Sequence, residues 1–185
     1  MQEIRWHGRG GQGGFTAARL LGMAASLYEN YYVQAFPSFG PERRGAPVLG
    51  FTRIDSKPIH DHSKVYRCDY VVVLDESLLD VVDVREGLRP DGVLLINSGK
   101  EGPHFAAASK YRVYTVDASS IAQEVLQQPV VNTAMFGALV AVSGLVSLEA
   151  ALRAVELTLP QAIWEKNQQV VKHAFNALSK TTLSR

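Results

Sequence analysis

The sequence predicts a single α/β domain, residues 1–185, with a mostly parallel, Rossmann-like sheet flanked by helices and a helical C-terminal part. Three observations favour this fold. Short segments rich in β-branched and aromatic residues alternate with helical segments in the N-terminal part. The run "DYVVVLD" is continuously apolar between acids, which is typical of a strand buried on both faces. From residue 132 onward the pattern is helical.

The first elements are expected around a glycine-rich loop. Residues 3–7 ("EIRWH") form a short strand that runs directly into this loop. Residues 15–30 form a helix, because apolar residues recur there at steps of three and four. Residues 31–36 ("YYVQAF") and 48–55 ("VLGFTRID") are two further strands, separated by a loop rich in proline and glycine.

The middle of the chain adds strands to the sheet. The apolar run 69–75 is a buried strand, and residues 76–88 are expected to form a short helix. Residues 91–98 ("DGVLLINS") and 111–119 ("YRVYTVDAS") are two more strands.

Three helices are expected at the C-terminal end, over residues 132–145, 147–159 and 160–180. Ser147 is placed as the N-cap of the second of them, and Glu149 lies in its first turn, where a negative charge is favourable.

The first strand has an unusual pattern. Ile4 and Trp6 alternate with Glu3, Arg5 and His7, whereas a central parallel strand is usually apolar on both faces. Either one face of this strand is solvated, or its polar groups contact a partner.

The composition excludes several classes of function. A formal net charge of +1 gives no overall field for nucleic acid or an anionic membrane. The one cysteine, Cys68, cannot hold an iron–sulfur cluster or a structural zinc by itself. His60 and His62 flank Asp61 without a third ligand nearby, so no metal site is expected. The start "MQEIRWHG" lacks the apolar core of a signal peptide, and the apolar stretch 130–146 is too short to span a membrane. We expect a cytoplasmic protein.

The loop "GRGGQGG" is the first candidate site. Gly8, Gly10 and Gly13 fit the pattern G-x-G-x-x-G between a strand and a helix, the context of a dinucleotide-binding loop. The acid expected at the end of the second strand is missing, so a tight strand-to-helix turn remains an alternative. Arg9 and Gln12 carry several hydrogen-bonding groups and indicate that the loop contacts a phosphate or another chain. The candidate residues are Gly8, Arg9, Gly10, Gly11, Gln12 and Gly13.

The second candidate lies within "QAFPSFGPERRGAPVL", residues 34–49. Pro41 and Gly45 shape a loop that presents Glu42, Arg43 and Arg44. Two phenylalanines and two arginines on one stiff loop are typical of an interface, so contact with a partner or an anionic ligand is expected. A solvated loop with a local Glu–Arg pair is the alternative.

Three segments, "GRGGQG", "AFPSFGPERRGAPV" and "VVNTAMFGAL", resemble in order and spacing the gamma subunit of the 2-oxoacid:ferredoxin oxidoreductases, the pyruvate synthase family. The resemblance extends along nearly the whole chain. The length of 185 residues fits a free-standing gamma subunit rather than a fused single-chain enzyme.

The resemblance implies one subunit of an enzyme that oxidatively decarboxylates a 2-oxoacid, with pyruvate the first expectation, to acyl-coenzyme A and CO₂. Electrons pass through iron–sulfur clusters to ferredoxin. Thiamine diphosphate and magnesium are expected on alpha and beta subunits, and the clusters on a delta-type subunit. This chain would hold no cofactor alone and would be inactive alone, with coenzyme A as a co-substrate of the complex.

The resemblance also implies where the sites lie. The glycine loop and Glu42, Arg43 and Arg44 would face the other subunits and the coenzyme A or diphosphate region. Asn132, a natural N-cap, and Thr133 would lie near the glycine loop and complete the same pocket. No catalytic residue is assigned to the chain. Two other functions remain open: a stand-alone nucleotide- or flavin-binding α/β protein, and a scaffold subunit without ligand contacts.

Overall fold

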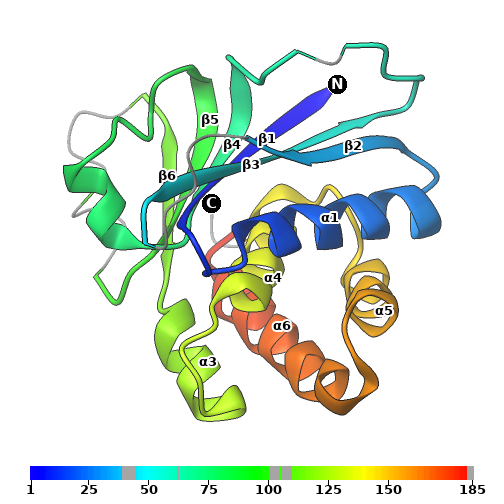
Figure 1. Ribbon diagram of the computed structural model, residues 1–185, viewed down its shortest axis with the longest axis vertical. Coiled ribbons are helices and arrows are strands. Elements are labelled where there is room, and N and C mark those ends of the chain that lie inside the picture. The colour runs from blue at the N-terminus through cyan, green and yellow to red at the C-terminus, as the bar shows by residue number, and fades with distance from the viewer. Residues whose placement is uncertain (39–44, 62, 101–104, 106–109, 183–185) are drawn as a thin grey trace.

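The computed structural model of the chain describes residues 1–38, 45–61, 63–100, 105 and 110–182, with side chains as far as residue 179. It confirms an α/β domain with a helical C-terminal part (Figure 1). The elements are, in order, β1 (Gln2–Arg9), α1 (Gly14–Tyr28), β2 (Tyr32–Pro37), β3 (Pro47–Asp55), β4 (Cys68–Val73), the short 3₁₀ helix η1 (Glu76–Asp80), β5 (Leu88–Asn97), β6 (Arg112–Val116), α3 (Ala118–Leu126), α4 (Asn132–Ser143), α5 (Leu148–Thr158) and α6 (Gln161–Thr182).

The described strands form one six-stranded sheet in the order β2-β3-β1-β4-β5-β6. The pairs β1–β4, β4–β5 and β5–β6 are parallel, while β3 runs antiparallel to both β1 and β2. After β1 the chain builds β2 and β3 on one side, and then crosses to β4 on the other side. The connections that follow β1 and β4 therefore run toward opposite edges of the sheet. This makes the carboxyl ends of these two strands a topological switch point, which is where open α/β sheets usually bind ligands.

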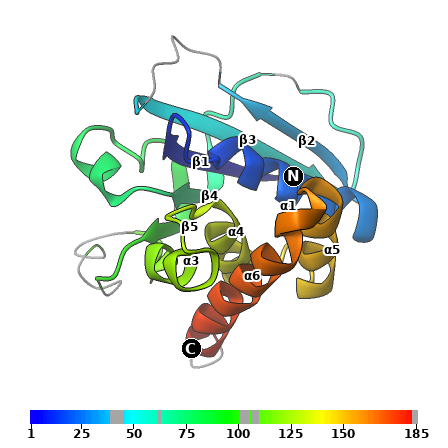
Figure 2. The same cartoon turned by 60° about the horizontal axis from the view of Figure 1, so that its bottom comes forward.

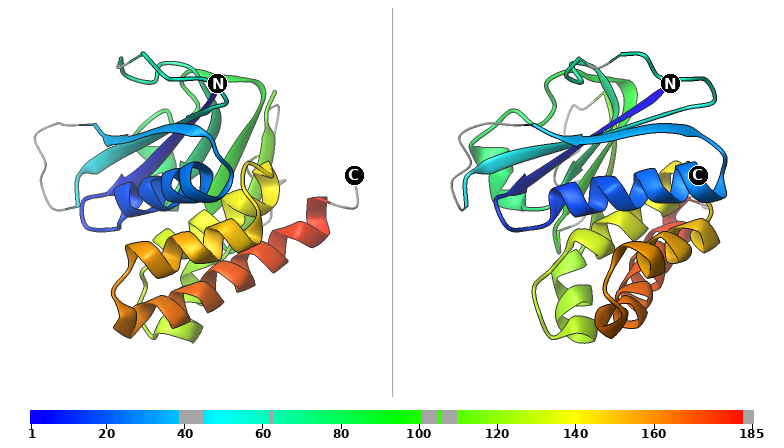
Figure 3. Two further views of the ribbon diagram at one scale, coloured as in Figure 1. Left: turned by 90° about the vertical axis from the view of Figure 1, so that its right-hand side faces the viewer. Right: turned by 45° about the vertical axis from the view of Figure 1, so that its right-hand side comes forward.

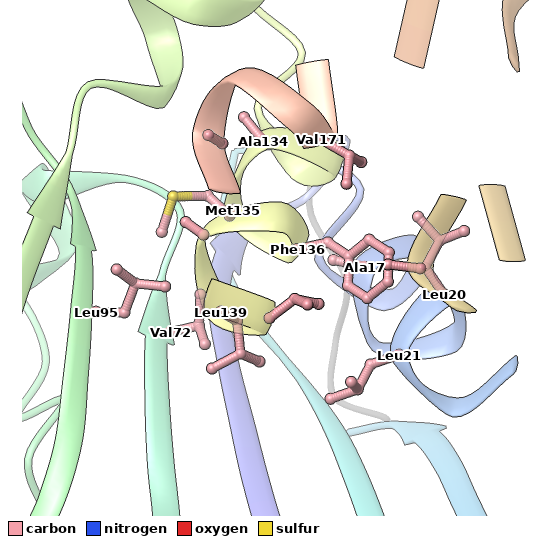
Figure 4. Packing of buried hydrophobic residues seen from close by; sticks show 14 of the residues in the cluster. Ala17, Leu20, Leu21, Val72, Leu95, Ala134, Met135, Phe136, Leu139 and Val171 are labelled. Atoms are coloured by element: carbon pink, nitrogen blue, oxygen red, sulfur yellow. The ribbon is translucent and has the colours of Figure 1, made fainter. Parts of the chain in front are cut away.

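The α-helices of the described chain lie on one side of the sheet, as the views in Figures 1, 2 and 3 agree. The main core fills the space between them and the sheet. Helix α4 is apolar all round and lies in the middle of this core, where Phe136 and Leu139 pack with Leu20 of α1 and Leu95 of β5 (Figure 4). The helical half thus holds α1, and with it the loop that precedes α1, firmly against the sheet.

The opposite face of the sheet is covered by η1 and long connections, with a second core that includes Phe51, Leu78 and Val84. The helix expected over 76–88 was wrong beyond Asp80. Val81, Val82 and Val84 are poor helix formers, and the Asp83 side chain accepts a hydrogen bond from the backbone N–H of Arg85, which favours a turn.

Neither expectation for the polar residues of β1 is correct, because this chain itself buries them. Glu3, Arg5 and His7 are each at most 7% exposed. Arg53 donates from Nε to Glu3 Oε1 at 3.0 Å, and Arg5 donates from Nε to His7 Nε2 at 2.9 Å. Arg5 also donates to the carbonyl of Val84, in the connection between η1 and β5 that covers this face of the sheet. The polar side chains on this one face of a central strand are thus satisfied internally.

Two further details of the helices differ from expectation. Helix α3 was not predicted as a separate element, although Asp117 caps it by accepting from the backbone N–H of Ser120. Asn132 is not an N-cap: it is the first helical residue of α4, with Val131 at the cap, and its Oδ1 accepts from the N–H of Thr133. Ser147 caps α5 as predicted, with Oγ accepting from Ala150 N–H at 3.1 Å.

Among the helices that the structure describes, none combines the length and apolar character needed to cross a membrane.

Candidate functional site

The glycine loop is a tight turn between β1 and α1. The backbone N–H of Gln12 donates to the Arg9 carbonyl at 3.0 Å, which closes the turn. Gly11 and Gly13 have positive φ angles of 94° and 75°, a region that side chains other than glycine rarely adopt. The N–H of Gly10 donates to the carbonyl of Ala46 at 3.0 Å. The loop is therefore tied to the start of β3 as well as to its own helix.

Asp75, two residues beyond the end of β4, holds the two polar side chains of the loop. Its Oδ2 accepts from Arg9 Nε at 3.0 Å and from Gln12 Nε2 at 2.9 Å. Its Oδ1 accepts from the backbone N–H of Ser77 at 3.0 Å and from the Ser77 hydroxyl at 2.6 Å. Desolvation raises the pKa of Asp75, but these hydrogen bonds and the Arg9 charge outweigh it, so that its pKa lies below the usual value. The carboxylate is thus fully engaged, since it offers about four acceptor positions.

Arg9 connects this carboxylate to the second candidate loop. One terminal nitrogen donates to the Gly45 carbonyl at 3.0 Å and the other to the Ser77 hydroxyl at 2.7 Å. Its backbone N–H donates to Gln12 Oε1 at 2.7 Å. The planar guanidinium thereby joins three chain segments: the glycine loop, the end of β4, and the residues before β3.

A hollow of about 610 Å³ lies on one side of the glycine loop. The first turn of α1 contributes Gly14, Phe15 and Thr16, and helix N-termini present backbone N–H groups that favour anions. The other wall is largely apolar and includes Pro37, Val48 and Leu49. The hollow combines anion-favouring donors with an apolar surface.

A second, more polar hollow of about 460 Å³ lies at the carboxyl ends of β4, β5 and β6. Asp75, Asn97 and Asp117 line it. Asn97 donates to the Leu74 carbonyl, and Asp117 accepts from Ser120, so these groups have partners within the chain. In the part of the chain that the structure describes, no three His, Cys, Asp or Glu side chains lie together in a way that could hold a metal ion.

The start of α4 lies beside the glycine loop, as expected, but its two polar residues differ in direction. The Asn132 carboxamide lies against Gly13, with Cγ at 3.1 Å from the position that a Cβ at Gly13 would take. Thr133 is fully buried, and its hydroxyl donates to Asn167 Oδ1 of α6 at 2.8 Å. Asn132 therefore shapes the loop, whereas the Thr133 side chain is committed to packing between helices.

Glu42, Arg43 and Arg44 lie outside the described residues. Of the described residues before and after them, Pro37 borders the hollow of about 610 Å³. The Gly45 carbonyl accepts a hydrogen bond from Arg9.

Sequence reasoning missed Asp75 and Ser77. The acid of a dinucleotide-binding site was expected at the end of the second strand of the chain. The strand that lies parallel beside β1 is instead β4. The acid that ends the buried apolar run 69–75 was the signal that could have found Asp75. Because Arg9, Gln12 and Ser77 occupy its acceptor positions, a ribose hydroxyl would have to displace one of them. This geometry disfavours the dinucleotide-binding alternative.

The chain is similar to known proteins over nearly its whole length. A profile of the family described as "Pyruvate ferredoxin/flavodoxin oxidoreductase" matches residues 3–177. The chain is 49% identical over 180 residues to pyruvate synthase subunit PorC of Methanothermobacter thermautotrophicus, covering 97% of each protein. It is 49% identical over 179 residues to the common subunit gamma of the pyruvate/ketoisovalerate oxidoreductases of Thermococcus kodakarensis, covering 95% of this chain and 96% of that one.

The fold is similar as well. The crystal structure of pyruvate oxidoreductase subunit PORC from Thermotoga maritima matches with a TM-score of 0.81 and 38% identity, over 95% of each chain. Sequence and fold thus agree along the chain, and the segments that carry the glycine loop and the start of α4 lie within the matched range. This chain belongs to the pyruvate ferredoxin/flavodoxin oxidoreductase family, in which it is a gamma subunit of a 2-oxoacid:ferredoxin oxidoreductase.

Proposed function

We propose that this gamma subunit works in a thiamine diphosphate-dependent complex that converts a 2-oxoacid, in the first instance pyruvate, to acyl-coenzyme A and CO₂, with the electrons passed to ferredoxin. The relatives named for pyruvate, and for pyruvate and ketoisovalerate, support this choice of substrates. The partners would be alpha, beta and delta-type subunits in the cytoplasm.

The cofactors would lie on the partners. A single cysteine cannot ligate a cluster, and the sequence has no Gly-Asp-Gly followed by a distant Asn-Asn pair, the pattern usually associated with thiamine diphosphate and magnesium. The role of this chain is then to form part of a binding site that is completed only when the subunits assemble. Thiamine diphosphate, when bound to the partners, would supply the carbanion chemistry of decarboxylation.

The larger hollow carries the proposal for coenzyme A. Backbone N–H groups at the start of α1 suit phosphate oxygens, and the apolar wall of Pro37, Val48 and Leu49 suits an uncharged extension of the same ligand. Coenzyme A has both parts. Arg43 and Arg44, which follow Pro37 in the sequence, would add charge-assisted hydrogen bonds to its phosphates.

Co-expression with candidate partner chains tests the assembly. A tag on this chain should recover subunits that carry thiamine diphosphate and iron–sulfur clusters, identified by mass spectrometry and by the visible absorption of the clusters. Titration of the purified chain with NAD, FAD and FMN in a calorimeter provides the opposing test. Tight uptake of any of these by the isolated chain would favour the stand-alone nucleotide-binding alternative.

A further inference from the structure

We infer that the open edge of β2, together with the groove between β2 and α1, binds an extended, acidic segment of a partner subunit as an additional strand of the sheet. Strand addition of this kind combines backbone hydrogen bonds, which supply affinity, with side-chain contacts, which supply specificity. The inference rests on the proposed function only in the choice of partner, which is another subunit of the same oxidoreductase.

The backbone of β2 has hydrogen-bonding groups that no described strand uses. Among the described strands, β2 lies at one edge of the sheet and pairs only with β3 (Figure 1). The N–H of Ser38 donates to the Leu49 carbonyl at 2.9 Å, and in an antiparallel pair such bonded positions alternate along the strand. The backbone of Gln34 therefore pairs with β3, whereas the N–H groups of Val33 and Ala35 point toward the open edge.

The sequence of β2 does little to prevent pairing with another chain. Natural edge strands are usually protected by charged side chains, bulges or prolines. The strand "YVQAFP" has no charged residue, and its one proline, Pro37, comes at the last position and leaves the N–H groups in the middle intact. Tyr32, at the start of the strand, is 49% exposed, and tyrosine is enriched at protein interfaces. This edge is thus suited to receive a strand.

A groove of about 340 Å³ lies beside this edge, between β2 and α1. Val33 and Ala35 line it on the β2 side. On the α1 side the lining residues extend from Phe15 to Ser26, a stretch of helix about 16 Å long. About five residues of an extended strand span the same distance. A strand added to β2 would therefore place every second side chain in the groove.

Arg19 indicates the charge of the segment that fits. It lines the groove, is exposed, and has no ion-pair partner among the described residues. Phe15 and Met23, four residues before and after it on the same face of α1, are apolar. The complementary segment carries apolar side chains at alternate positions and an aspartate or glutamate opposite Arg19. A second copy of this chain fits less well, because its β2 offers no carboxylate.

Hydrogen exchange of single amides tests the strand addition directly. In the assembled complex the amides of Val33 and Ala35 should exchange about tenfold more slowly than in the isolated chain, because each gains an acceptor. The amide of Gln34 should exchange slowly in both preparations, since β3 already pairs with it. Equal exchange of Val33 and Ala35 in the two preparations would overturn the inference.

A competition between two differently tagged chains tests the charge of the segment. Arg19→Glu and parent chains are co-expressed with the partner subunits, and mass spectrometry measures their ratio in the purified complex. We expect Arg19→Glu to be depleted about tenfold, because it sets a like charge against the acidic segment. Lys172→Glu is the matched control. Lys172 is exposed on α6, does not line the groove, and its variant should be incorporated as well as the parent chain. Equal incorporation of Arg19→Glu would contradict an acidic segment.

A photoreactive amino acid in place of Ser26, an exposed residue that lines the groove, identifies the occupant. After irradiation of the purified complex, the cross-linked peptide should come from another subunit and contain aspartate or glutamate. A peptide from a second copy of this chain would overturn the inference. If the chain co-purifies with the thiamine diphosphate and cluster subunits but gives neither the cross-link nor the exchange pattern, only the strand addition fails. Failure to co-purify would instead overturn the proposed function and, with it, the choice of partner.

Discussion

The carboxamide of Asn132, at the start of α4, lies so close to the α-carbon of Gly13 that a methyl group on Gly13 would overlap its Nδ2 atom. Gly13 also caps α1 with a φ angle of 75°. Glycine is therefore required there for two separate reasons, backbone conformation and space. The contact joins two of the three segments on which the family resemblance depends, and it fixes the direction in which α1 leaves the glycine loop.

The two requirements can be separated by comparing two alanine variants. Gly11→Ala meets only the backbone penalty, since its φ is 94° but no atom lies within 4 Å of the added Cβ. We expect it to lower the free energy of unfolding by about 1–2 kcal/mol. Gly13→Ala should lower it by a further 1–3 kcal/mol, about the usual cost of overpacking. Urea denaturation of both variants measures the difference, and equal losses would show that Asn132 moves aside freely.

His7 gives the stability of the protein a specific dependence on pH. Burial, followed by the nearby Arg5 charge, lowers the pKa of His7 to about 3. The unfolded chain therefore binds a proton that the folded chain excludes, at all pH values from about 6.5 down to about 3. The contribution of His7 to folding is complete above pH 6.5 and is lost as the pH falls through that range.

His7→Gln should remove this dependence, because its side-chain oxygen can still accept from Arg5 Nε while it has no proton to exclude. The slope of unfolding free energy against pH between about 6.5 and 5, above the carboxylate range, should flatten. The exposed His173 supplies the control, and His173→Gln should keep the parent slope. An unchanged slope in His7→Gln would mean that the buried imidazole does become protonated in the folded protein.

Arg53 supports the loop-covered face of the sheet. Its side chain is 1% exposed, pairs with Glu3 at 3.0 Å, and lies over the Phe36 ring at 5.6 Å. Arg53→Met should lower the free energy of unfolding by about 3–5 kcal/mol, because it leaves the Glu3 carboxylate buried without its main partner.

The control for this variant is an exposed pair. Arg85 and Asp83 are 57% and 66% exposed at their side chains, and Arg85→Met should change stability by less than about 0.5 kcal/mol. Chemical denaturation midpoints of the two variants give the comparison. A small effect of Arg53→Met would show that the methionine packs well enough to offset the lost pair.

Arg44→Ala tests ligand contact against a pure scaffold role. In the assembled complex we expect a higher apparent KM for coenzyme A, by about tenfold for one lost contact between an arginine and a phosphate. Steady-state kinetics at varied coenzyme A measure it. Unchanged kinetics with unchanged assembly would favour a scaffold subunit without ligand contacts.

The fold was predictable from the sequence because its strands and helices follow simple patterns. The apolar run at residues 69–75 became β4, and the periodic segment 15–30 became α1 with ends within two residues. Ser147 was recognisable as a cap from its type and position. The reversed direction of β3, however, comes from the pairing of segments that are distant in sequence, and no local pattern specifies it.

The candidate site was predictable only in part for the same reason. The positions of Arg9 and Gln12 in a glycine loop were evident, but their partner Asp75 lies more than sixty residues away. The alternation of Glu3, Arg5 and His7 with apolar residues suggested that these side chains contact solvent or a partner chain. The connections that bury them have no sequence signature of their own. Contacts that depend on strand order were thus the part that sequence alone did not specify.

The most direct test of the account is reconstitution of the oxidoreductase with and without this chain. The measured quantity is pyruvate-dependent reduction of ferredoxin at varied coenzyme A, together with the subunit content of each preparation. We predict that the chain co-purifies with the subunits that carry thiamine diphosphate and iron–sulfur clusters, and that coenzyme A-dependent turnover requires it. Full turnover in its absence, or its recovery as a monomer with a bound nucleotide, would contradict the account.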